Sequence, residues 1–304
     1  MKRHRIFLSA VAICGLLIAA TVGASSVRRE LPYEFDIVPI DHGIGITNTA
    51  TWNQRDLIVS YGERGETPQS NTLMKGSLNQ CVIQGLKGGQ TYSLRIKRAD
   101  LKGKLLYKTF EAEIEVLDPA PKYVVLVGAS VGKEWDLPSF PDRTGESGYT
   151  FGYRGRYSHD KESLITPFLS AQLKPVVVII KECAAYFPED KDKIVEKLPR
   201  WVDLLKASGI TPVLATCVPV TVDNDRNNPG RQAAIEDVNQ FIRTYTEKNN
   251  IGLLDLASVL RVDENNGYLR ESYARQDGLH LQADAYKPLD EILVPTIASA
   301  ERKD

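Results

Sequence analysis

Two short motifs in this 304-residue sequence combine residue types that can carry out nucleophilic catalysis. The first is Gly128-Ala129-Ser130, in which a serine directly follows an apolar run. A serine between a strand and a helix lies where backbone N–H groups point outward and favour developing negative charge. The same pattern is also typical of a helix N-cap. Ser130 is therefore a candidate nucleophile whose role depends on a partner base.

The second motif is the sequence DGLHL, which contains Asp277 and His280. Gly278 permits a tight bend that brings the carboxylate to the imidazole. A carboxylate on one ring nitrogen fixes the tautomer and stabilises the imidazolium, and the other nitrogen is then free to take a proton from a hydroxyl. The alternative is an ordinary histidine in a surface loop. The other histidines lie in the basic N-terminus, the strand-rich region and a polar loop: His4, His42 and His159.

The sequence around these motifs alternates between apolar runs and amphipathic helical patterns. The apolar runs cover residues 123–130, 175–182, 210–218 and 251–257, and the helical patterns cover 191–207 and 231–248. Continuous apolar strands that alternate with helices indicate a parallel sheet with helices on both faces. Such sheets carry their sites at the carboxyl ends of the strands. We therefore expect a three-layer α/β/α domain over residues 119–304.

The residues before this domain have a different hydrophobic pattern. Short alternating runs at 56–63, 79–86, 91–100 and 104–117 predict strands, the last of these runs a strand pair. Short strands at even spacing favour a small all-β sandwich over residues 31–117. The proline-containing segment 118–121 marks the joint between the two domains.

The first 24 residues have the pattern of a secretory signal. Basic residues 2–5 are followed by an uncharged apolar run, 6–22, and then by small residues. We expect cleavage after Ala24. The apolar run is near the lower limit for spanning a bilayer, so an uncleaved N-terminal anchor is the alternative. Ile13 before Cys14 does not suit a lipidation signal. The sequence thus predicts an exported protein, periplasmic or extracellular, that contacts a membrane only through this segment.

Composition and spacing argue against several other functions. The net charge is −1, which does not indicate nucleic-acid binding. The cysteines form no CxxC pair, so a thiolate zinc site is not expected. The run GASVGKE lacks the spacing of a phosphate-binding loop. The Asp- and Asn-rich run 222–232 lacks the glycine and glutamate of a calcium loop and is interpreted as a polar loop over the site. We expect no metal and no organic cofactor.

Taken together, the GxS motif after the first strand and DGxHL before the last helix resemble the SGNH/GDSL hydrolases. These are flavodoxin-like α/β enzymes, and the resemblance covers residues 119–304. It implies that Ser130 is the nucleophile, His280 the general base and Asp277 its orienting acid. It also implies an oxyanion hole that includes the N–H of Ser130.

The remaining oxyanion donors match the family less well. A glycine after the second strand normally donates its N–H, and Gly155 fits better than Gly152, the second choice. An asparagine after the third strand normally donates its side chain, but Cys183 stands at that position. A thiol is a poor donor. Other side chains that could approach are Arg154, Arg156 and Lys181.

The strand-rich region resembles a fibronectin type III domain at one corner. Leu86, Tyr92, Leu94 and Ile96 match that corner, and Trp52 could be the early core tryptophan. Any other sandwich of similar size is the alternative.

These features predict an exported serine esterase that removes acyl groups, most simply acetyl groups, from a carbohydrate or envelope ester. A lipid esterase is one alternative. A non-catalytic cell-surface binding or scaffold protein with a decayed site is the other, and the missing asparagine motivates it. Cys183 and Cys217 follow neighbouring strands and could form either a disulfide or two buried free thiols.

Overall fold

The computed structural model describes residues 35–48, 56–67, 70–74, 80–98, 109–155 and 161–303. The predicted signal segment, Trp52, Arg156 and His159 lie outside these residues. Within the described ranges, no helix combines the length and the apolar character needed to cross a membrane.

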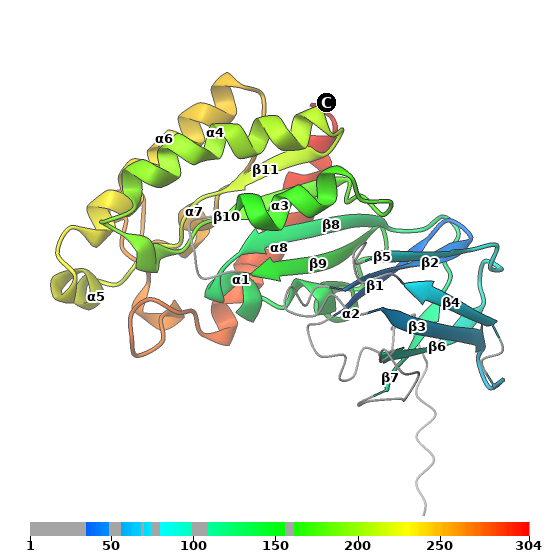
Figure 1. Cartoon of the computed structure of the whole chain (residues 1–304). Helices are drawn as coiled ribbons and strands as arrows, with labels where there is room; N and C mark the ends of the chain where they lie inside the picture. Colours follow the sequence, from blue (N-terminus) through cyan, green and yellow to red (C-terminus); the bar gives the residue numbers. More distant parts are fainter. Residues whose placement is uncertain are drawn as a thin grey trace, which may run out of the picture.

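The larger part of the chain forms a parallel sheet in the order β12-β11-β10-β8-β9 (Figure 1). Its strands are β8 (Lys122–Gly128), β9 (Tyr149–Gly155), β10 (Val177–Lys181), β11 (Thr211–Ala215) and β12 (Gly252–Leu254). The central strands are buried on both faces, which explains their continuous apolar sequences. Along β8, Val125 and Val127 pack into one core while Val124 and Leu126 pack into the other.

Helices cover both faces of this sheet, so the expected three-layer α/β/α fold is confirmed (Figure 1). One face carries α3 (Glu162–Leu169), α4 (Lys191–Ala207) and α6 (Arg231–Lys248). The other carries α1 (Ser130–Glu134), α2 (Phe140–Thr144), α7 (Leu256–Leu260) and α8 (Tyr286–Glu301). Both α4 and α6 have the bounds that the apolar periodicity predicts. The connections contain α5 (Val222–Asn227) and the short 3-10 helices η1 (Leu137–Ser139), η2 (Ala184–Tyr186), η3 (Glu271–Tyr273) and η4 (Ala283–Ala285).

The N-terminal part consists of two antiparallel sheets, β1-β2-β5 and β4-β3-β6-β7, which share one apolar core. Their strands are β1 (Phe35–Ile40), β2 (Gly43–Asn48), β3 (Leu57–Glu63), β4 (Ser70–Met74), β5 (Gln80–Gln84), β6 (Thr91–Arg98) and β7 (Phe110–Glu115). Of the strand pair expected over 104–117, the described residues form β7 alone. Residues 101–108 are outside the described part.

Parallel strands all end at the same edge of a sheet, and this edge gathers the residues that the sequence singles out. The chain leaves β8 into Ser130, ends β9 at Gly155, and passes from β10 to Cys183. After β11 it reaches Thr221, the N-cap of α5. The fold thus puts four connecting segments at the place where doubly wound sheets bind ligands.

Candidate active site

Ser130 is the first residue of α1 and is only 6% exposed. The preceding Ala129 is extended, and the Tyr153 hydroxyl donates a hydrogen bond to its carbonyl at 3.0 Å. A Cβ on Gly128 would lie 3.5 Å from the carbonyl oxygen of Lys181, an ordinary contact distance, so the end of β8 runs close beside the end of β10. The serine is therefore held between the carboxyl ends of β9 and β10.

Asp277 and His280 form the pair that the sequence predicts. The Nδ1 atom of His280 lies 2.6 Å from Oδ2 of Asp277. The other carboxylate oxygen accepts the backbone N–H groups of Leu279 at 3.0 Å and His280 at 2.9 Å. Partial burial opposes ionisation of this carboxyl, but the hydrogen bonds from His280 and Leu279 outweigh burial and lower the pKa of Asp277 to about 2. An ionised carboxylate on Nδ1 leaves Nε2 of His280 as the nitrogen that can accept a proton.

The turn between these two residues depends on Gly278. Its φ of +66° is in the left-handed region, and a Cβ there would collide with the Thr221 hydroxyl. The Gly278 carbonyl accepts the N–H of Thr221 at 3.0 Å. The Asn224 side chain donates to the Asp277 carbonyl at 2.7 Å. The start of α5 therefore fixes the Asp277–His280 turn from one side.

The opposite side of this turn is tied to the serine helix. The N–H of Arg275 donates to the His280 carbonyl at 2.8 Å. The Arg275 guanidinium bonds both carboxylate oxygens of Glu134, the last residue of α1, at 3.2 and 3.0 Å. Ser130 begins this same short helix. The hydroxyl and the imidazole are thus on two directly connected elements at one edge of the sheet.

Between the two described side chains of Ser130 and His280 no hydrogen bond is formed. Catalytic hydrogen bonds often tighten only when substrate binds. The pairing of His280 with Asp277, by contrast, is fully formed.

The sheet register distinguishes the two glycines considered for the oxyanion hole. Gly155 is the register partner of Gly128, so it lies at the carboxyl edge beside the serine loop. Gly152 pairs with Val125 in the middle of the strand. A Cβ on Gly152 would collide with the Asp36 carboxylate, which gives this glycine a packing role. Gly155 is therefore the glycine whose position suits an oxyanion donor.

The third strand ends in a buried cluster of charges. Lys181 and Glu182 are each 1% exposed, and Lys161 is fully buried beside them. The Nζ atom of Lys161 is 3.4 Å from a Glu182 carboxylate oxygen, a distance and geometry that give an ion pair without a formed hydrogen bond. Lys181 donates instead to the Glu182 backbone carbonyl at 3.0 Å. Burial raises the pKa of Glu182 to about 7 and lowers the pKa of Lys181.

Two arginines were considered above as alternative oxyanion donors. Arg154 is buried and paired with Asp36, and Arg156 is outside the described residues. Cys183 is buried at the asparagine position implied by the family resemblance. Cys183 and Cys217 are both free thiols, so the two-thiol alternative holds in this structure. Burial raises the pKa of Cys217 to about 12, which keeps it a neutral thiol.

Sequence reasoning missed the groups that hold the segments carrying Ser130 and His280 in place. The sequence 221–225, a threonine followed by acidic residues, is an N-cap pattern that could have revealed α5. The region read as a polar loop is instead α5 and the start of α6. Among the described residues, no three His, Cys, Asp or Glu side chains gather as metal ligands would. Local patterns contained no signal for the contacts of Arg275, Glu134 and Tyr153.

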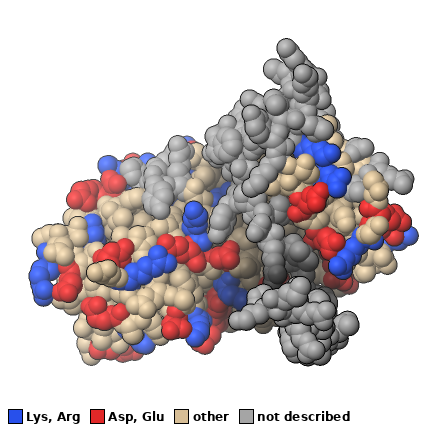
Figure 2. Space-filling view, turned by 90° about the horizontal axis from the view of Figure 1, so that it is seen from below, with Lys and Arg blue, Asp and Glu red and all other residues tan. Residues whose placement is uncertain are grey.

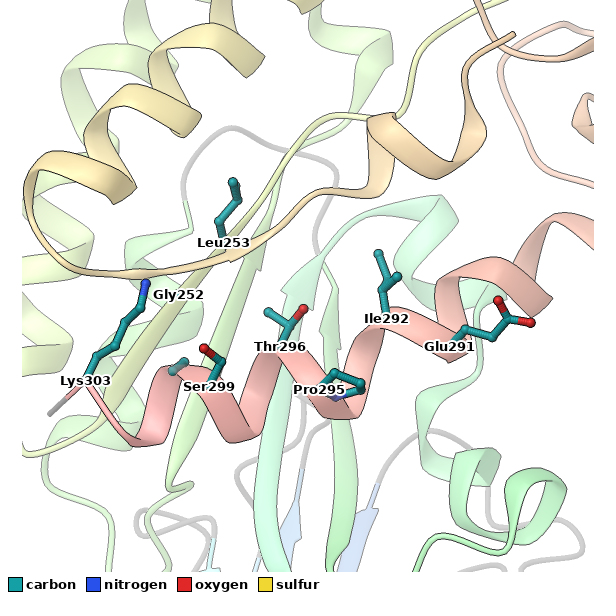
Figure 3. Close-up of a pocket in the computed structure, with 9 residues that line it drawn as sticks. Gly252, Leu253, Glu291, Ile292, Pro295, Thr296, Ser299 and Lys303 are labelled. Carbon is teal, nitrogen blue, oxygen red and sulfur yellow. The ribbon is translucent and has the colours of Figure 1, made fainter. Parts of the chain in front are cut away.

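Two surface features lie apart from this edge. A shallow cavity of about 420 Å³ is lined by the start of β12 and the second half of α8, including Gly252 and Thr296 (Figure 3). Ser130, Asp277 and His280 are not among its lining residues. On the face shown in Figure 2, acidic and basic side chains are interspersed over the described residues. Such a mixed surface fits the near-zero net charge.

No protein-family profile and no curated protein sequence matches the chain. Among solved structures, the chain is similar to a GDSL-like lipase from Bacteroides thetaiotaomicron, with 21% identity, 59% of this chain and 89% of that chain covered, and a TM-score of 0.48. It is similar to a lipase/acylhydrolase from Enterococcus faecalis, with 17% identity, 58% and 95% covered, and a TM-score of 0.46. It is also similar to the catalytic domain of a peptidoglycan O-acetyltransferase from Streptococcus pneumoniae, with 16% identity, 60% and 96% covered, and a TM-score of 0.44. The activity in each name belongs to that protein.

Proposed function

We propose that this chain is an exported serine esterase of the SGNH type that works through an acyl-enzyme. One observation carries the proposal: the carboxylate of Asp277 holds Nδ1 of His280 at 2.6 Å, in a turn that Arg275 ties to the helix beginning at Ser130. This is the arrangement that a hydroxyl nucleophile needs, because the base must be oriented before it can take a proton.

The first half-reaction forms the ester bond to the enzyme. Nε2 of His280 takes the proton of the Ser130 hydroxyl as Oγ attacks the ester carbonyl. The tetrahedral intermediate then collapses, the bond to the leaving alcohol breaks, and that alcohol receives the proton from His280. Asp277 stays ionised throughout, because its pKa of about 2 is far below working pH, and it stabilises the imidazolium.

The second half-reaction repeats these steps with water. His280 removes a proton from a water molecule, which attacks the acyl carbonyl, and the proton then passes to Oγ of Ser130 as the acid leaves. In both half-reactions we assign the backbone N–H groups of Ser130 and Gly155 to the oxyanion. Their support is the register of Gly155 beside Gly128 at the carboxyl edge. Backbone donors fixed in advance stabilise the developing charge without reorganisation.

An acetylated carbohydrate or envelope glycan is the substrate we propose. The support is the combination of a signal-like N-terminus with a separate β-sandwich ahead of the catalytic unit. Export gives access to envelope esters, and a second module is suited to holding a polymer near the site. Lipid esters are the second choice, and a comparison of acetylated xylan with a long-chain nitrophenyl ester separates the two.

We further propose that the β-sandwich is fibronectin type III-like. The Tyr92 hydroxyl, near the start of β6, accepts the backbone N–H of Lys87 at 3.0 Å. A tyrosine that bonds back to the chain a few residues upstream is the tyrosine corner of immunoglobulin-like sandwiches. The two antiparallel sheets around one core support the same interpretation.

The alternative is a non-catalytic surface protein with a decayed site. Cys183 favours it, since a thiol at the asparagine position is a poor oxyanion donor. The preserved Asp277–His280 pair argues against it, because a carboxylate on Nδ1 has little value without proton transfer.

The decisive test uses purified protein that contains both domains and lacks only the predicted signal, residues 1–24. We expect hydrolysis of nitrophenyl acetate and covalent labelling of Ser130 by a fluorophosphonate probe. Ser130→Ala should lower kcat at least about 10⁴-fold and abolish labelling, with an unchanged circular dichroism spectrum. Ser139→Ala, which removes a serine bonded to Asp136 nearby, is the matched control and should keep full activity. A folded protein that neither turns over esters nor labels would favour the scaffold alternative.

A further inference from the structure

A buried ion pair joins the N-terminal sandwich to the strand that ends at the proposed oxyanion glycine. Asp36 of β1 accepts a hydrogen bond from Nη1 of Arg154 in β9 at 2.5 Å. The same oxygen of Asp36 accepts the hydroxyl of Tyr123 in β8 at 2.6 Å. Both charged side chains are only 9% exposed. A carboxylate from one unit thus lies inside the other, held by two donors.

The residues that surround the Asp36 carboxylate leave space for it and compensate its charge. A Cβ on Gly152 would collide with Asp36 and with the Tyr123 hydroxyl, so only glycine leaves space for the pair. Although burial opposes a charged guanidinium, the Asp36 carboxylate raises the pKa of Arg154. Removal of one partner would leave the other charge buried and uncompensated, which is strongly unfavourable. The pair is therefore fixed in place and is not an incidental surface contact.

Arg154 is the neighbour of Gly155, whose backbone N–H is the proposed oxyanion donor. It directly precedes Gly155, and its Nη1 atom also donates to the Tyr153 carbonyl at 2.9 Å. Tyr153 in turn bonds the Ala129 carbonyl, one residue before Ser130. Through these contacts the guanidinium fixes the last peptide groups of β9. One of them is the peptide group between Arg154 and Gly155, which carries the Gly155 N–H.

The sandwich is anchored around this pair by further contacts. Val38 of β1 packs into the same apolar core as Val125. The Gln80 side chain donates to the Leu173 carbonyl at 3.1 Å and accepts the Leu173 N–H at 3.2 Å. These contacts, one from β1 and two from β5 of the same sheet, hold the β1-β2-β5 sheet against the α/β part, so Asp36 approaches Arg154 from a supported strand.

We propose that Asp36 is a positioning residue for catalysis: it holds Arg154, and through Arg154 the Gly155 peptide, so that the sandwich completes the oxyanion hole from outside the α/β domain. This inference rests on the proposed esterase function. A group that acts only on the oxyanion changes transition-state binding more than substrate binding.

The test compares full-length Asp36→Asn with Asp41→Asn. Asp41 also joins the two units, since its carboxylate accepts the Ala120 N–H at 3.2 Å, but at an exposed position away from β9. For Asp36→Asn we expect kcat to fall about 10- to 100-fold with KM within twofold, and hydrogen exchange to accelerate in a peptide covering 149–155. For Asp41→Asn we expect neither change. A folded Asp36→Asn variant with wild-type kcat would overturn the proposal.

If Asp36→Asn does not fold, Tyr123→Phe decides the question, because it removes one hydrogen bond to Asp36 and keeps both charges. A several-fold lower kcat at unchanged KM supports the proposal, and an unchanged kcat overturns it. Failure of the esterase function itself would be distinguishable, because the wild-type protein would then show no Ser130-dependent turnover. In that case, hydrogen exchange still tests the link from Asp36 to the end of β9. An unchanged exchange rate of the 149–155 peptide in Asp36→Asn would reject this link as well.

Discussion

The guanidinium of Arg275 spans the gap between two chain segments that are 141 residues apart and bonds both carboxylate oxygens of Glu134. Arg275 is also hydrogen-bonded through its N–H to the His280 carbonyl. The helix that begins at Ser130 and the turn that carries His280 are therefore joined at a single side chain. In the proposed mechanism, we expect this bridge to matter more for the alignment of Ser130 and His280 than for the stability of the fold.

We therefore expect Arg275→Ala to lower kcat about 3- to 10-fold, because small misplacements of catalytic groups are costly. The free energy of unfolding should fall by only about 1 kcal/mol or less, since both side chains are partly exposed. Steady-state kinetics and chemical denaturation measure the two effects. Arg226→Ala removes a different exposed arginine–carboxylate pair, with Asp223, and is the control that should leave kcat unchanged. Equal kinetics in both variants would refute the bridge's role.

Gly278→Ala should disable the site. The substitution strains a residue with φ of +66° and drives a methyl group into the Thr221 hydroxyl. We expect a loss of about 2–3 kcal/mol in the free energy of unfolding and a larger than 10-fold fall in kcat. Gly209 offers a matched control, because its φ is +71° but a Cβ there meets nothing within 4 Å. Gly209→Ala should cost about 1–2 kcal/mol from strain alone and keep kcat. Comparable kcat values in the two variants would contradict this account.

Glu182 should make the fold less stable as the solution becomes less acidic. The pKa of this carboxyl is about 7 in the folded state against 4.5 in the unfolded state, because burial outweighs the attraction of Lys161 and Lys181. Between these values the folded state holds a proton that the unfolded state has lost, so the free energy of unfolding falls as pH rises from about 4.5 to 7. The Glu182→Gln variant should not show this decrease in the free energy of unfolding. In the wild type we expect the decrease to be of the order of 1–3 kcal/mol.

Urea denaturation of both proteins at pH 4.5, 6 and 7.5 measures the difference. The wild type should lose stability relative to Glu182→Gln across this series. Parallel curves for the two proteins would show that Glu182 is ionised in the folded state throughout. Glu189→Gln, which changes an exposed carboxylate a few residues along the chain, is the control and should follow the wild type.

Cys183→Asn should raise activity. The family resemblance puts an amide donor at this position, and one well-placed oxyanion donor contributes about 10²–10³-fold in kcat. Because the introduced amide would fit this site only in part, we expect kcat on nitrophenyl acetate to rise by about 10-fold or more. Cys183→Ser, a smaller donor of similar volume to cysteine, should give a lesser gain. A lower kcat in the asparagine variant, with intact Ser130 labelling, would mean that the site has been rebuilt around the thiol.

The sequence by itself determined the strand and helix alternation of the α/β part, because apolar periodicity reports directly on which faces are buried. It gave α4 and α6 with their observed bounds. It also gave the Asp277–His280 pair, since three residues and a glycine turn suffice to bring these groups together. In contrast, β1 and β2 escaped detection, because Pro39, Gly43 and Gly45 weaken the local strand signal.

Only the tertiary structure decided the contacts between distant segments. The sequence favoured Gly155 over Gly152 from its place near the end of the strand, but the position of Gly155 beside Gly128 depends on the register of β9 against β8, and a local pattern contains no register. The pairs Asp36–Arg154, Lys161–Glu182 and Arg275–Glu134 join residues far apart in the chain. A charged side chain in a sequence looks the same whether it faces water or a buried partner. For Asp36–Arg154 and Lys161–Glu182, packing removes the water and makes each charge dependent on its buried partners.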